Sequence, residues 1–406
     1  MSLFARSAAW SLLLLLLGAG CGRGDTQATR RVAAHTRPAV RAASQPTYDD
    51  VHGGGFVRPT RPATTAAAIP APTPRPAPAL SVDDATRLQV FLDRENFGPG
   101  KLDGRSGEFT RKALARYGRA RGRTFPPPGA ALLAALPEAA KVRPFTLYTV
   151  AAADVAQVGA MPEKVSDQGK LKTLPYTSVL ELLGERFHSE RDFLRRINPG
   201  VNLGALTAGS RVKVPNIEDP LNVPRLAQRG HLIPRRPEFA PRVVEVHTKE
   251  KMLDVLEDGE LLASFPITPG STTLPAPPGT WKIDNMASLP FFRYDEAMLN
   301  HGVRSDNFVN LPPGPNSPVG VLWMGLNRRG IGLHGTANPE TIGRAASHGC
   351  IRLANWDAVK LSQLVTTGTT VKIDGTPKPP APPAAVRESG TATSAPVVAP
   401  PSAPGR

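Results

Sequence analysis

The sequence predicts a multidomain protein in which a β-rich, β-sandwich-like domain forms the C-terminal third, after a small helical domain and an α+β module. Three observations support this fold class. The 44 prolines among 406 residues exceed what one compact domain accommodates, so part of them belongs to linkers. Helical periodicity begins near Ser81, and alternating apolar strands replace it from about Pro241.

The first 21 residues have the pattern of an export signal. Arg6 supplies the positive start, Leu12 to Leu17 form an apolar run, and three small residues precede Cys21. The run is too short to span a bilayer as a helix. A cysteine directly after small residues resembles the lipobox of bacterial lipoproteins. This implies a lipid anchor on Cys21, contact with a membrane, and a location in the periplasm or cell envelope.

Export determines whether Cys350, the second cysteine, has a possible disulfide partner. If Cys21 is lipidated, Cys350 is the only thiol of the mature chain and has no intramolecular disulfide partner. A single exported cysteine is either a buried apolar residue or a reactive group. Its neighbours decide between the two.

The net charge of +15 raises the question of nucleic acid. The basic residues are spread along the chain; the segment 22–80, for example, carries eight Arg against three Asp, and no RNA- or DNA-binding motif accompanies them. The composition favours a solvated surface loosely attracted to an anionic wall or membrane, with no nucleic-acid partner.

The segments 22–80 and 376–406 are rich in Pro and Ala and have little apolar surface to bury. We expect both to be disordered, the first as a semi-extended tether and the second as a tail.

The segment 81–140 is expected to form the helical domain. Ser81 is the N-cap of a first helix whose apolar face is predicted to hold Val82, Leu88, Phe91 and Leu92. A turn-rich "FGPGKLDGRSG" leads to a second helix, "EFTRKALARYGRARG". This helix–loop–helix resembles the small peptidoglycan-binding domain of wall hydrolases.

The segment 144–217 is expected to form the α+β module. "FTLYTV" predicts a strand, and the later sequence predicts two helices, a turn and a second strand ending in "VKVPN". This ending resembles a LysM wall-binding domain, with a long insertion at 151–175. Glycan binding by this module and a purely spacing role both remain open.

The segment 241–375 is expected to form the β-rich domain. Two apolar runs around Asp258 and Gly259 predict a hairpin. "GTWKI", "GVLWMGL", "IGLHG" and "TTVKI" predict further strands, and "NWDAVKLSQLV" predicts a helix. There is no GxGxxG or P-loop, and no cofactor is expected.

Cys350 lies in "SHGC", and with His334 it completes the spacing His-x13-His-x-Cys. A thiol attacks well only as the thiolate, so it needs a base or a positive charge nearby. His334 and His348 offer the base. Arg352, two residues on and therefore on the same strand face, could bind a carboxylate.

Glycines next to the two histidines add to this pattern. Gly335 and Gly349 let the backbone approach a substrate closely. The consecutive amides of His348, Gly349 and Cys350 could point at a developing oxyanion.

Two other interpretations fit less well. An inert, buried cysteine would have two histidines and two glycines as poor packing partners. A zinc site from His334, His348 and Cys350 lacks a fourth ligand and the usual CxxC or HExxH spacing, so no metal is expected. Three further histidines are expected at the surface or in loops: His188, His247 and His301.

"HGT" followed by "ASHGCIRLAN" resembles the catalytic domain of YkuD-type L,D-transpeptidases, and the similarity extends over about residues 241–374. The resemblance implies that Cys350 is the nucleophile and that His334 is the general base and acid. It also implies supporting roles, with the Gly335 carbonyl orienting the imidazole. Ser347 and His348 would support the loop, Gly349 would contribute to the oxyanion hole, and Arg352 and Asn355 would serve substrate binding.

The resemblance further implies a reaction on peptidoglycan. Cys350 would attack a tetrapeptide stem, release D-Ala, and pass the acyl group to a second stem in a 3→3 cross-link. Water or the lysine of a wall-anchored lipoprotein are alternative acceptors, which would make the enzyme an L,D-carboxypeptidase or a lipoprotein-attaching enzyme. An NlpC/P60-type peptidase places cysteine before histidine, unlike this chain. A non-enzymatic wall-binding scaffold conflicts with the intact His334 and Cys350.

Overall fold

The structure is a computed structural model that describes residues 80–271, 274–344 and 349–375. These residues belong to one compact unit, 73–406. No helix within these ranges is long and apolar enough to cross a membrane. Several predictions lie outside the described residues: the signal 1–21 with Cys21, nearly all of the tether 22–80, the tail 376–406, and Ser347 and His348.

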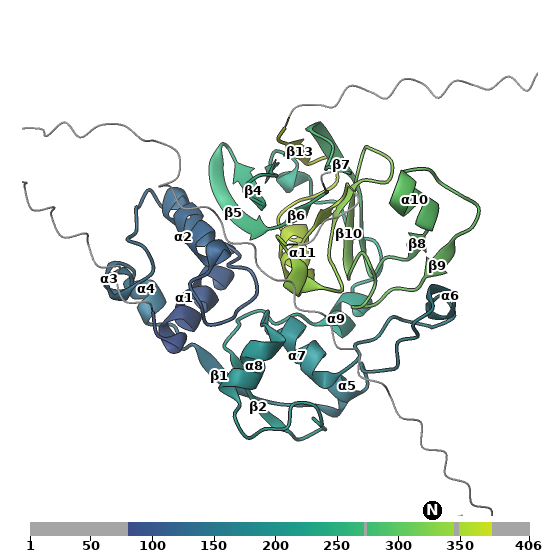
Figure 1. Cartoon of the computed structure of the whole chain (residues 1–406). Coiled ribbons are helices and arrows are strands. Elements are labelled where there is room, and N and C mark those ends of the chain that lie inside the picture. Colours follow the sequence, from purple (N-terminus) through teal and green to yellow (C-terminus); the bar gives the residue numbers. More distant parts are fainter. Residues whose placement is uncertain (1–79, 272–273, 345–348, 376–406) are drawn as a thin grey trace, which may run out of the picture. The chain divides into compact units, whose positions relative to one another are not determined.

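Four helices form the first part of the described chain (Figure 1): α1 (Val82–Arg94), α2 (Glu108–Ala120), α3 (Ala130–Ala135) and α4 (Pro137–Ala140). The two predicted helices, α1 and α2, are confirmed. The Ser81 hydroxyl caps α1 by accepting the Asp84 N–H at 3.1 Å. Three of the four predicted apolar positions are buried, but Val82 is 52% exposed because it starts the helix next to solvent.

The next part has the order strand, helix, helix, strand, which confirms the predicted elements. Its elements are β1 (Phe145–Thr149), α7 (Val179–Arg186), α8 (Arg191–Ile197) and β2 (Arg211–Pro215). The two strands pair antiparallel. Asn198 joins α8 to β2, because its side-chain amide donates to the Leu194 and Lys213 carbonyls and accepts the Lys213 N–H. We call this part the βααβ unit.

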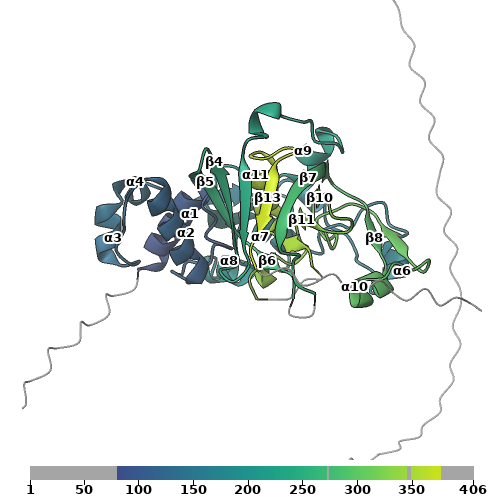
Figure 2. The same cartoon turned by 90° about the horizontal axis from the view of Figure 1, so that it is seen from above.

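The insertion 151–175 in the βααβ unit contacts the β-rich domain. It contains α5 (Ala152–Val155) and α6 (Val165–Gln168). Figure 1 shows α6 beside β9 (Val309–Leu311), and Figure 2 shows it beside β8 (Phe292–Tyr294), the strand that pairs with β9. The Leu174 N–H donates to the Pro313 carbonyl at 2.9 Å. The Asn316 side-chain amide donates to the Pro175 carbonyl at 2.7 Å. The βααβ unit is therefore packed onto the β-rich domain.

The β-rich class predicted for residues 241–375 is confirmed. Nine strands form one sheet in the order β5-β4-β3-β13-β7-β10-β11-β12-β6. Their bounds are β3 (Val243–His247), β4 (Met252–Glu257), β5 (Glu260–Pro266), β6 (Thr268–Pro269), β7 (Gly279–Ser288), β10 (Leu322–Leu326), β11 (Gly332–His334), β12 (Ile351–Arg352) and β13 (Thr370–Ile373).

The sandwich-like expectation needs a refinement at β7. The first four residues of this ten-residue strand pair with β13, and the residues from Ile283 onward pair with β10. β7 thus joins the strands from β5 to β13 with those from β10 to β6, so the nine strands form one continuous sheet instead of two.

The remaining elements connect or cover the sheet. They are α9 (Val223–Gln228), η1 (Pro237–Phe239), β8 (Phe292–Tyr294), α10 (Glu296–His301), η2 (Pro339–Thr341) and α11 (Asn355–Ser362). The predicted C-terminal helix is α11. It contacts β10 and β11, and its buried Ala358 and Leu361 belong to the same apolar core as both halves of the sheet (Figure 1).

The predicted hairpin is confirmed between β4 and β5, where Glu257 pairs with Glu260. Asp258 and Gly259 have φ angles of 52° and 85°. Two successive left-handed residues make the tight turn whose twist matches that of antiparallel strands, which is why Asp-Gly is a strong hairpin signal.

The helical part covers the edge of the sheet at β5. Phe97 forms a bridge with Ser264, and the Gly98 N–H donates to the Ser264 carbonyl at 2.7 Å. Next to this contact, Arg116 of α2 donates to the fully buried Asp254 of β4 at 2.8 Å. Covering an edge in this way removes a row of unpaired backbone groups.

This ion pair gives a stability prediction. We expect Asp254→Ala to destabilise the fold by about 3 kcal/mol, because the nearly buried Arg116 loses its buried counter-charge. Glu245→Ala, which removes a more exposed pair with Lys372, should cost less than about 1 kcal/mol. Urea unfolding curves of the two variants test this, and equal midpoint shifts would contradict it.

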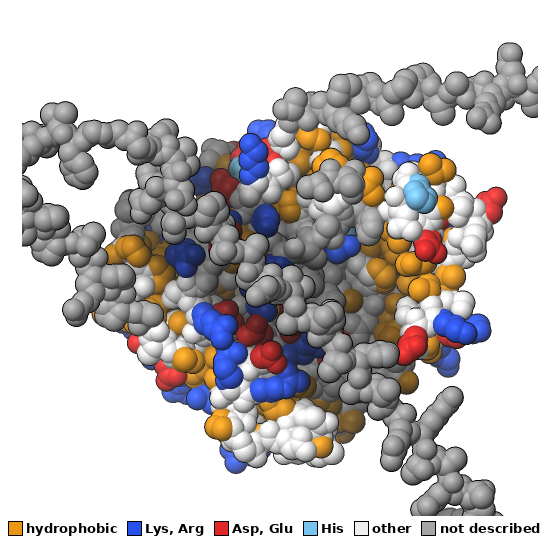
Figure 3. Space-filling model, in the orientation of Figure 1, with side chains coloured by type: hydrophobic (Ala, Val, Ile, Leu, Met, Phe, Trp, Pro, Cys, Tyr) orange, Lys and Arg blue, Asp and Glu red, His pale blue; other side chains and the backbone are white. Residues whose placement is uncertain are grey.

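Basic and acidic side chains are interleaved on the face seen in Figure 3, where blue and red atoms lie next to each other over the described residues. The excess positive charge does not gather into one basic surface on that face. This agrees with the diffuse distribution along the sequence.

Candidate active site

Four neighbouring strands place one row of side chains on the same face of the sheet. Trp323 of β10 is paired with His334 of β11, His334 with Arg352 of β12, and Arg352 with Thr268 of β6. Directly paired residues point to the same face. The row therefore brings an indole, an imidazole and a guanidinium side by side.

Cys350 lies directly before β12, and its backbone continues the hydrogen bonding of that strand. Its carbonyl accepts the Gly270 N–H at 3.2 Å, which continues the ladder between β12 and β6. Cys350 is two residues before Arg352, so the alternation of a strand puts both side chains on one face. His334 and Cys350 are sixteen residues apart in sequence, and β12, which begins directly after Cys350, pairs with the strand that contains His334.

The imidazole of His334 is held in one orientation. Its Nδ1 lies 2.6 Å from the Gly335 carbonyl oxygen, and its ring stacks on Trp323 with centroids 5.7 Å apart and planes at 25°. Burial lowers the pKa of His334 to about 4, with a further lowering from the charge of Arg352. The ring is therefore neutral near pH 7, and its proton is on Nδ1, because the Gly335 carbonyl oxygen can only accept a hydrogen bond.

Two glycines make room for the indole of Trp323. A Cβ atom at Gly332 would lie 2.8 Å from the Trp323 ring, and one at Gly325 would lie 2.8 Å from its Nε1. The ring thus lies across the backbone of β10 and β11. Any larger residue at either position would displace the surface on which His334 stacks.

The thiol of Cys350 is half-buried. Burial raises its pKa above the ordinary value, while a backbone hydrogen bond and the charge of Arg352 oppose this. Its Sγ lies 3.4 Å from the Gly330 carbonyl oxygen. Gly349, directly before it, has a φ of 95°, a backbone conformation that favours glycine.

Arg352 is also half-buried, and desolvation lowers its pKa. No carboxylate of residues 80–271, 274–344 or 349–375 lies within ion-pair distance of its guanidinium. A half-buried cation without a nearby carboxylate is a favourable place for an anionic group of a substrate.

Asn355, for which the resemblance implies a role in substrate binding, lies inside the protein. Asn355 is fully buried. Its Oδ1 accepts the N–H groups of Val321 and Thr336 at 3.1 Å each, and its Nδ2 donates to both carboxyl oxygens of Glu185. The polar atoms of Asn355 thus hold the backbone at Val321 and Thr336.

His188 lies in the turn after α7, which agrees with the expected surface or loop position, but its side chain is buried. His188 is 1% exposed, lies 2.9 Å from Asp93, and stacks on Trp356 with centroids 5.1 Å apart. His301 is exposed at the end of α10, as predicted. His247 is half-buried at 3.3 Å from Asp254. None of the three belongs to the row of His334.

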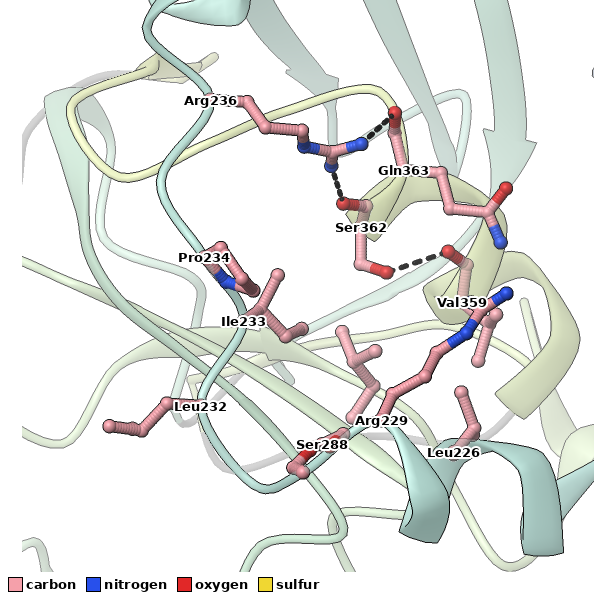
Figure 4. Close-up of a pocket in the computed structure, with 12 residues that line it drawn as sticks. Leu226, Arg229, Leu232, Ile233, Pro234, Arg236, Ser288, Val359, Ser362 and Gln363 are labelled. Atoms are coloured by element: carbon pink, nitrogen blue, oxygen red, sulfur yellow. Dashed lines mark hydrogen bonds between the residues drawn. The ribbon is translucent and has the colours of Figure 1, made fainter.

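A cavity of about 220 Å³ lies elsewhere, between α9, β7 and α11 (Figure 4). Arg236 lines it, and its guanidinium donates to the carbonyls of Ser362 and Gln363 at the end of α11. His334, Cys350 and Arg352 do not line this cavity. The guanidinium of Arg236, the main polar group of this cavity, thus caps the end of α11. The cavity is separate from the row that contains His334 and Arg352.

Sequence reasoning did not find Trp323 or Glu185. Trp323 is read from the sequence as one apolar residue of a strand, and its stacking on His334 depends on the register between β10 and β11. Glu185 lies in a different part of the chain, 170 residues before Asn355, and had no local motif to mark it.

Known proteins are similar to this chain over the β-rich domain. A family model described as the L,D-transpeptidase catalytic domain, YkuD, matches residues 241–373. The protein named as the L,D-transpeptidase YkuD in Bacillus licheniformis is 29% identical over 194 residues, covering 48% of this chain and 92% of that protein. Its namesake in Bacillus subtilis strain 168 is 28% identical over 181 residues, covering 45% and 84%.

Among solved structures, an L,D-transpeptidase from Mycobacterium smegmatis matches with a TM-score of 0.28 and 19% identity, over 33% of this chain and 59% of that one. The range of the family model contains the whole nine-stranded sheet and the row with His334 and Arg352. Residues 241–373 of this chain are therefore an L,D-transpeptidase catalytic domain of the YkuD type.

Proposed function

We propose that Cys350 is the nucleophile of this transpeptidase and that His334 is its general base and acid. The observation that carries the proposal is the state of His334. Its Nδ1 is engaged by the Gly335 carbonyl, and its low pKa of about 4 keeps the ring neutral. The other ring nitrogen, Nε2, then has a lone pair that can take the proton of the thiol on the same face.

The first half of the reaction forms a thioester. His334 Nε2 takes the thiol proton as Sγ of Cys350 bonds to the carbonyl carbon of the third residue of a donor stem tetrapeptide. The bond from this carbon to the nitrogen of the terminal D-Ala then breaks. The leaving nitrogen takes the proton from the imidazolium, so free D-Ala departs and His334 is neutral again.

The second half transfers the acyl group. The amine of a second stem peptide attacks the thioester carbon and gives a proton to His334. The carbon–sulfur bond breaks, and the thiolate recovers its proton from the imidazolium. The products are a new amide, which is a 3→3 cross-link, and the original thiol. Each half is an acyl transfer that needs no metal or organic cofactor.

The groups around the thiol have further roles in this proposal. The backbone amides of Gly349 and Cys350, with that of His348, stabilise the oxyanion of each tetrahedral intermediate. The positive φ of Gly349 supports a turn of the backbone at this point. Arg352 binds a carboxylate of the stem peptide, and Ser347 and His348 support the loop.

We further propose that the chain works in the cell envelope, anchored by lipid at Cys21 and contacting wall glycan through its N-terminal parts. The apolar run and small residues before Cys21 support the anchor. The helical part resembles peptidoglycan-binding domains, and the βααβ unit resembles LysM modules. The acceptor could also be water or a lipoprotein lysine, which makes the product the decisive observable.

Product mass identifies the acceptor. The full chain is incubated with purified disaccharide-tetrapeptide, with and without an added lysine-bearing peptide, and the products are analysed by mass spectrometry. We expect a dimer whose mass equals two tetrapeptides minus one alanine. Tripeptide alone would identify water as the acceptor, and a conjugate of the added peptide would identify a lysine. No change in mass under either condition would contradict the proposed function.

A further inference from the structure

The loop that follows His334 is held by a buried side chain from a different part of the protein. The N–H of Thr336 donates to Oδ1 of Asn355 at 3.1 Å. The Nδ2 of Asn355 donates to the two carboxyl oxygens of Glu185 at 2.9 and 3.1 Å. Glu185 belongs to α7 of the βααβ unit, outside the catalytic domain, and is 5% exposed.

The contact between Thr336 and Asn355 lies two residues along the chain from His334. Gly335, between His334 and Thr336, has the carbonyl on which Nδ1 of His334 rests. The backbone at this point packs tightly on Asn355, because a Cβ atom at Gly335 would lie 2.1 Å from its Oδ1. A Cβ at Gly320, next to the second N–H that Asn355 accepts, would lie 2.0 Å away. A change in the place of Asn355 therefore has to move the Gly335 carbonyl.

We propose that Glu185 is a positioning residue for the transpeptidase reaction, acting through Asn355 and the loop after β11 to orient His334. The proposal rests on the proposed function of His334 as the base. It makes the βααβ unit part of the catalytic apparatus, in addition to any role at the wall. Glu185 itself does not touch the substrate or the reacting atoms.

Glu185 is a buried carboxyl that accepts hydrogen bonds, which lower its pKa, while burial raises the pKa more strongly. Its direct partners are the Asn355 amide and the Tyr176 hydroxyl, at 3.1 Å from Oε2. The charges of Glu181 and Arg191 act on it with opposite sign. Burial raises the pKa of Glu185 to about 8, so the group avoids the cost of a buried charge at neutral pH. A carboxyl kept neutral in this way can be replaced by an amide without a change of charge.

A second contact supplies the matched control. Arg191 of α8 pairs with Glu340 of η2 at 3.0 Å, which also joins the βααβ unit to the loop after His334. Both side chains are about one-third or more exposed. Such a pair contributes little, because water and salt screen it. Arg191→Gln thus perturbs the same interface without touching Asn355.

The experiment measures how fast a carbapenem acylates Cys350 in the full chain, by intact mass and peptide mapping, from pH 3.5 to 9. The variants are Glu185→Leu, Glu185→Asp, Glu185→Gln and Arg191→Gln. We expect roughly a 10- to 100-fold slower acylation for Glu185→Leu and a smaller loss for Glu185→Asp, because small displacements of a catalytic group have large effects. Glu185→Gln and Arg191→Gln should remain within about threefold of the parent chain.

The pH dependence separates positioning from loss of fold. In Glu185→Leu, His334 loses its fixed contact with Gly335, so its pKa should change. The pH at which the acylation rate falls on the acidic side should therefore differ from about 4. Wild-type rates and an unmoved limb in both Glu185→Leu and Glu185→Asp would overturn the proposal. Equal losses in Arg191→Gln and Glu185→Leu would also overturn it, as general weakening of the interface. If Glu185→Leu does not fold, the acylation rates of Glu185→Asp and Glu185→Gln are compared instead. A slower rate in Glu185→Asp alone supports the proposal, and equal rates overturn it.

Failure of the proposed function gives a different result. If the parent chain itself forms no carbapenem adduct, the same variants are compared by the rate at which iodoacetamide alkylates Cys350. This rate depends on the thiol and its base and needs no transpeptidase substrate. A slower rate in Glu185→Leu and not in Glu185→Gln would still support the positioning role, and equal rates would reject it.

Discussion

Replacement of Cys350 by alanine is expected to abolish both product formation and carbapenem acylation, with a loss of at least ~10³-fold against the parent chain. Without the thiol there is no atom to carry the acyl group between donor and acceptor. The side chain is half-buried and small, so alanine should change the thermal midpoint little. The measurement is dimer and tripeptide formation from disaccharide-tetrapeptide, together with a melting curve.

The other cysteine of the chain provides the control. Cys21→Ala removes a thiol from the same protein, and turnover in solution should remain at the level of the parent chain. Product formed at an undiminished rate by Cys350→Ala would discard the assignment of the nucleophile. Loss of turnover together with loss of the folded state would point to a structural role for Cys350 instead.

The sequence was sufficient to predict the parts of the site that are close in the chain. His334, Gly335, Cys350 and Arg352 lie within nineteen positions, and the charge of Arg352 acts on the Cys350 thiol two residues before it. The tight hairpin at Asp258 and Gly259 was predictable for the same reason, because a two-residue turn depends on local backbone preferences.

The contacts that cross between parts of the chain could not be predicted in this way. Asn355 looked like a substrate ligand beside the SHGC motif, but its partner Glu185 is 170 residues away. His188 was expected at the surface or in a loop, and its buried contacts with Asp93 and Trp356 could not be predicted from its neighbours in sequence. Such contacts arise when whole helices dock, and periodicity along one segment carries no information on them.

Replacement of His334 by asparagine is the second large effect. We expect acylation of Cys350 near pH 7 to fall by about 10²- to 10⁴-fold, the usual contribution of a general base. Asparagine is a smaller polar residue that can still donate to the Gly335 carbonyl, so the buried site keeps a hydrogen bond at this position. The burial that raises the pKa of Cys350 leaves little thiolate at neutral pH, so the thiol depends on the base.

The two proteins should differ in the form of their pH profiles. In the parent chain the neutral form of His334 is active, and it is lost only as the pH falls through about 4, so the rate should stay nearly level from about pH 5 to 8. In His334→Asn the reactive species is the small thiolate fraction, which grows about tenfold per pH unit below the thiol pKa. The variant should therefore recover activity steadily as the pH rises, while the parent does not. An acidic limb near pH 6.5 in the parent would mean a solvated imidazole, and a level profile in the variant would mean that another group takes the proton.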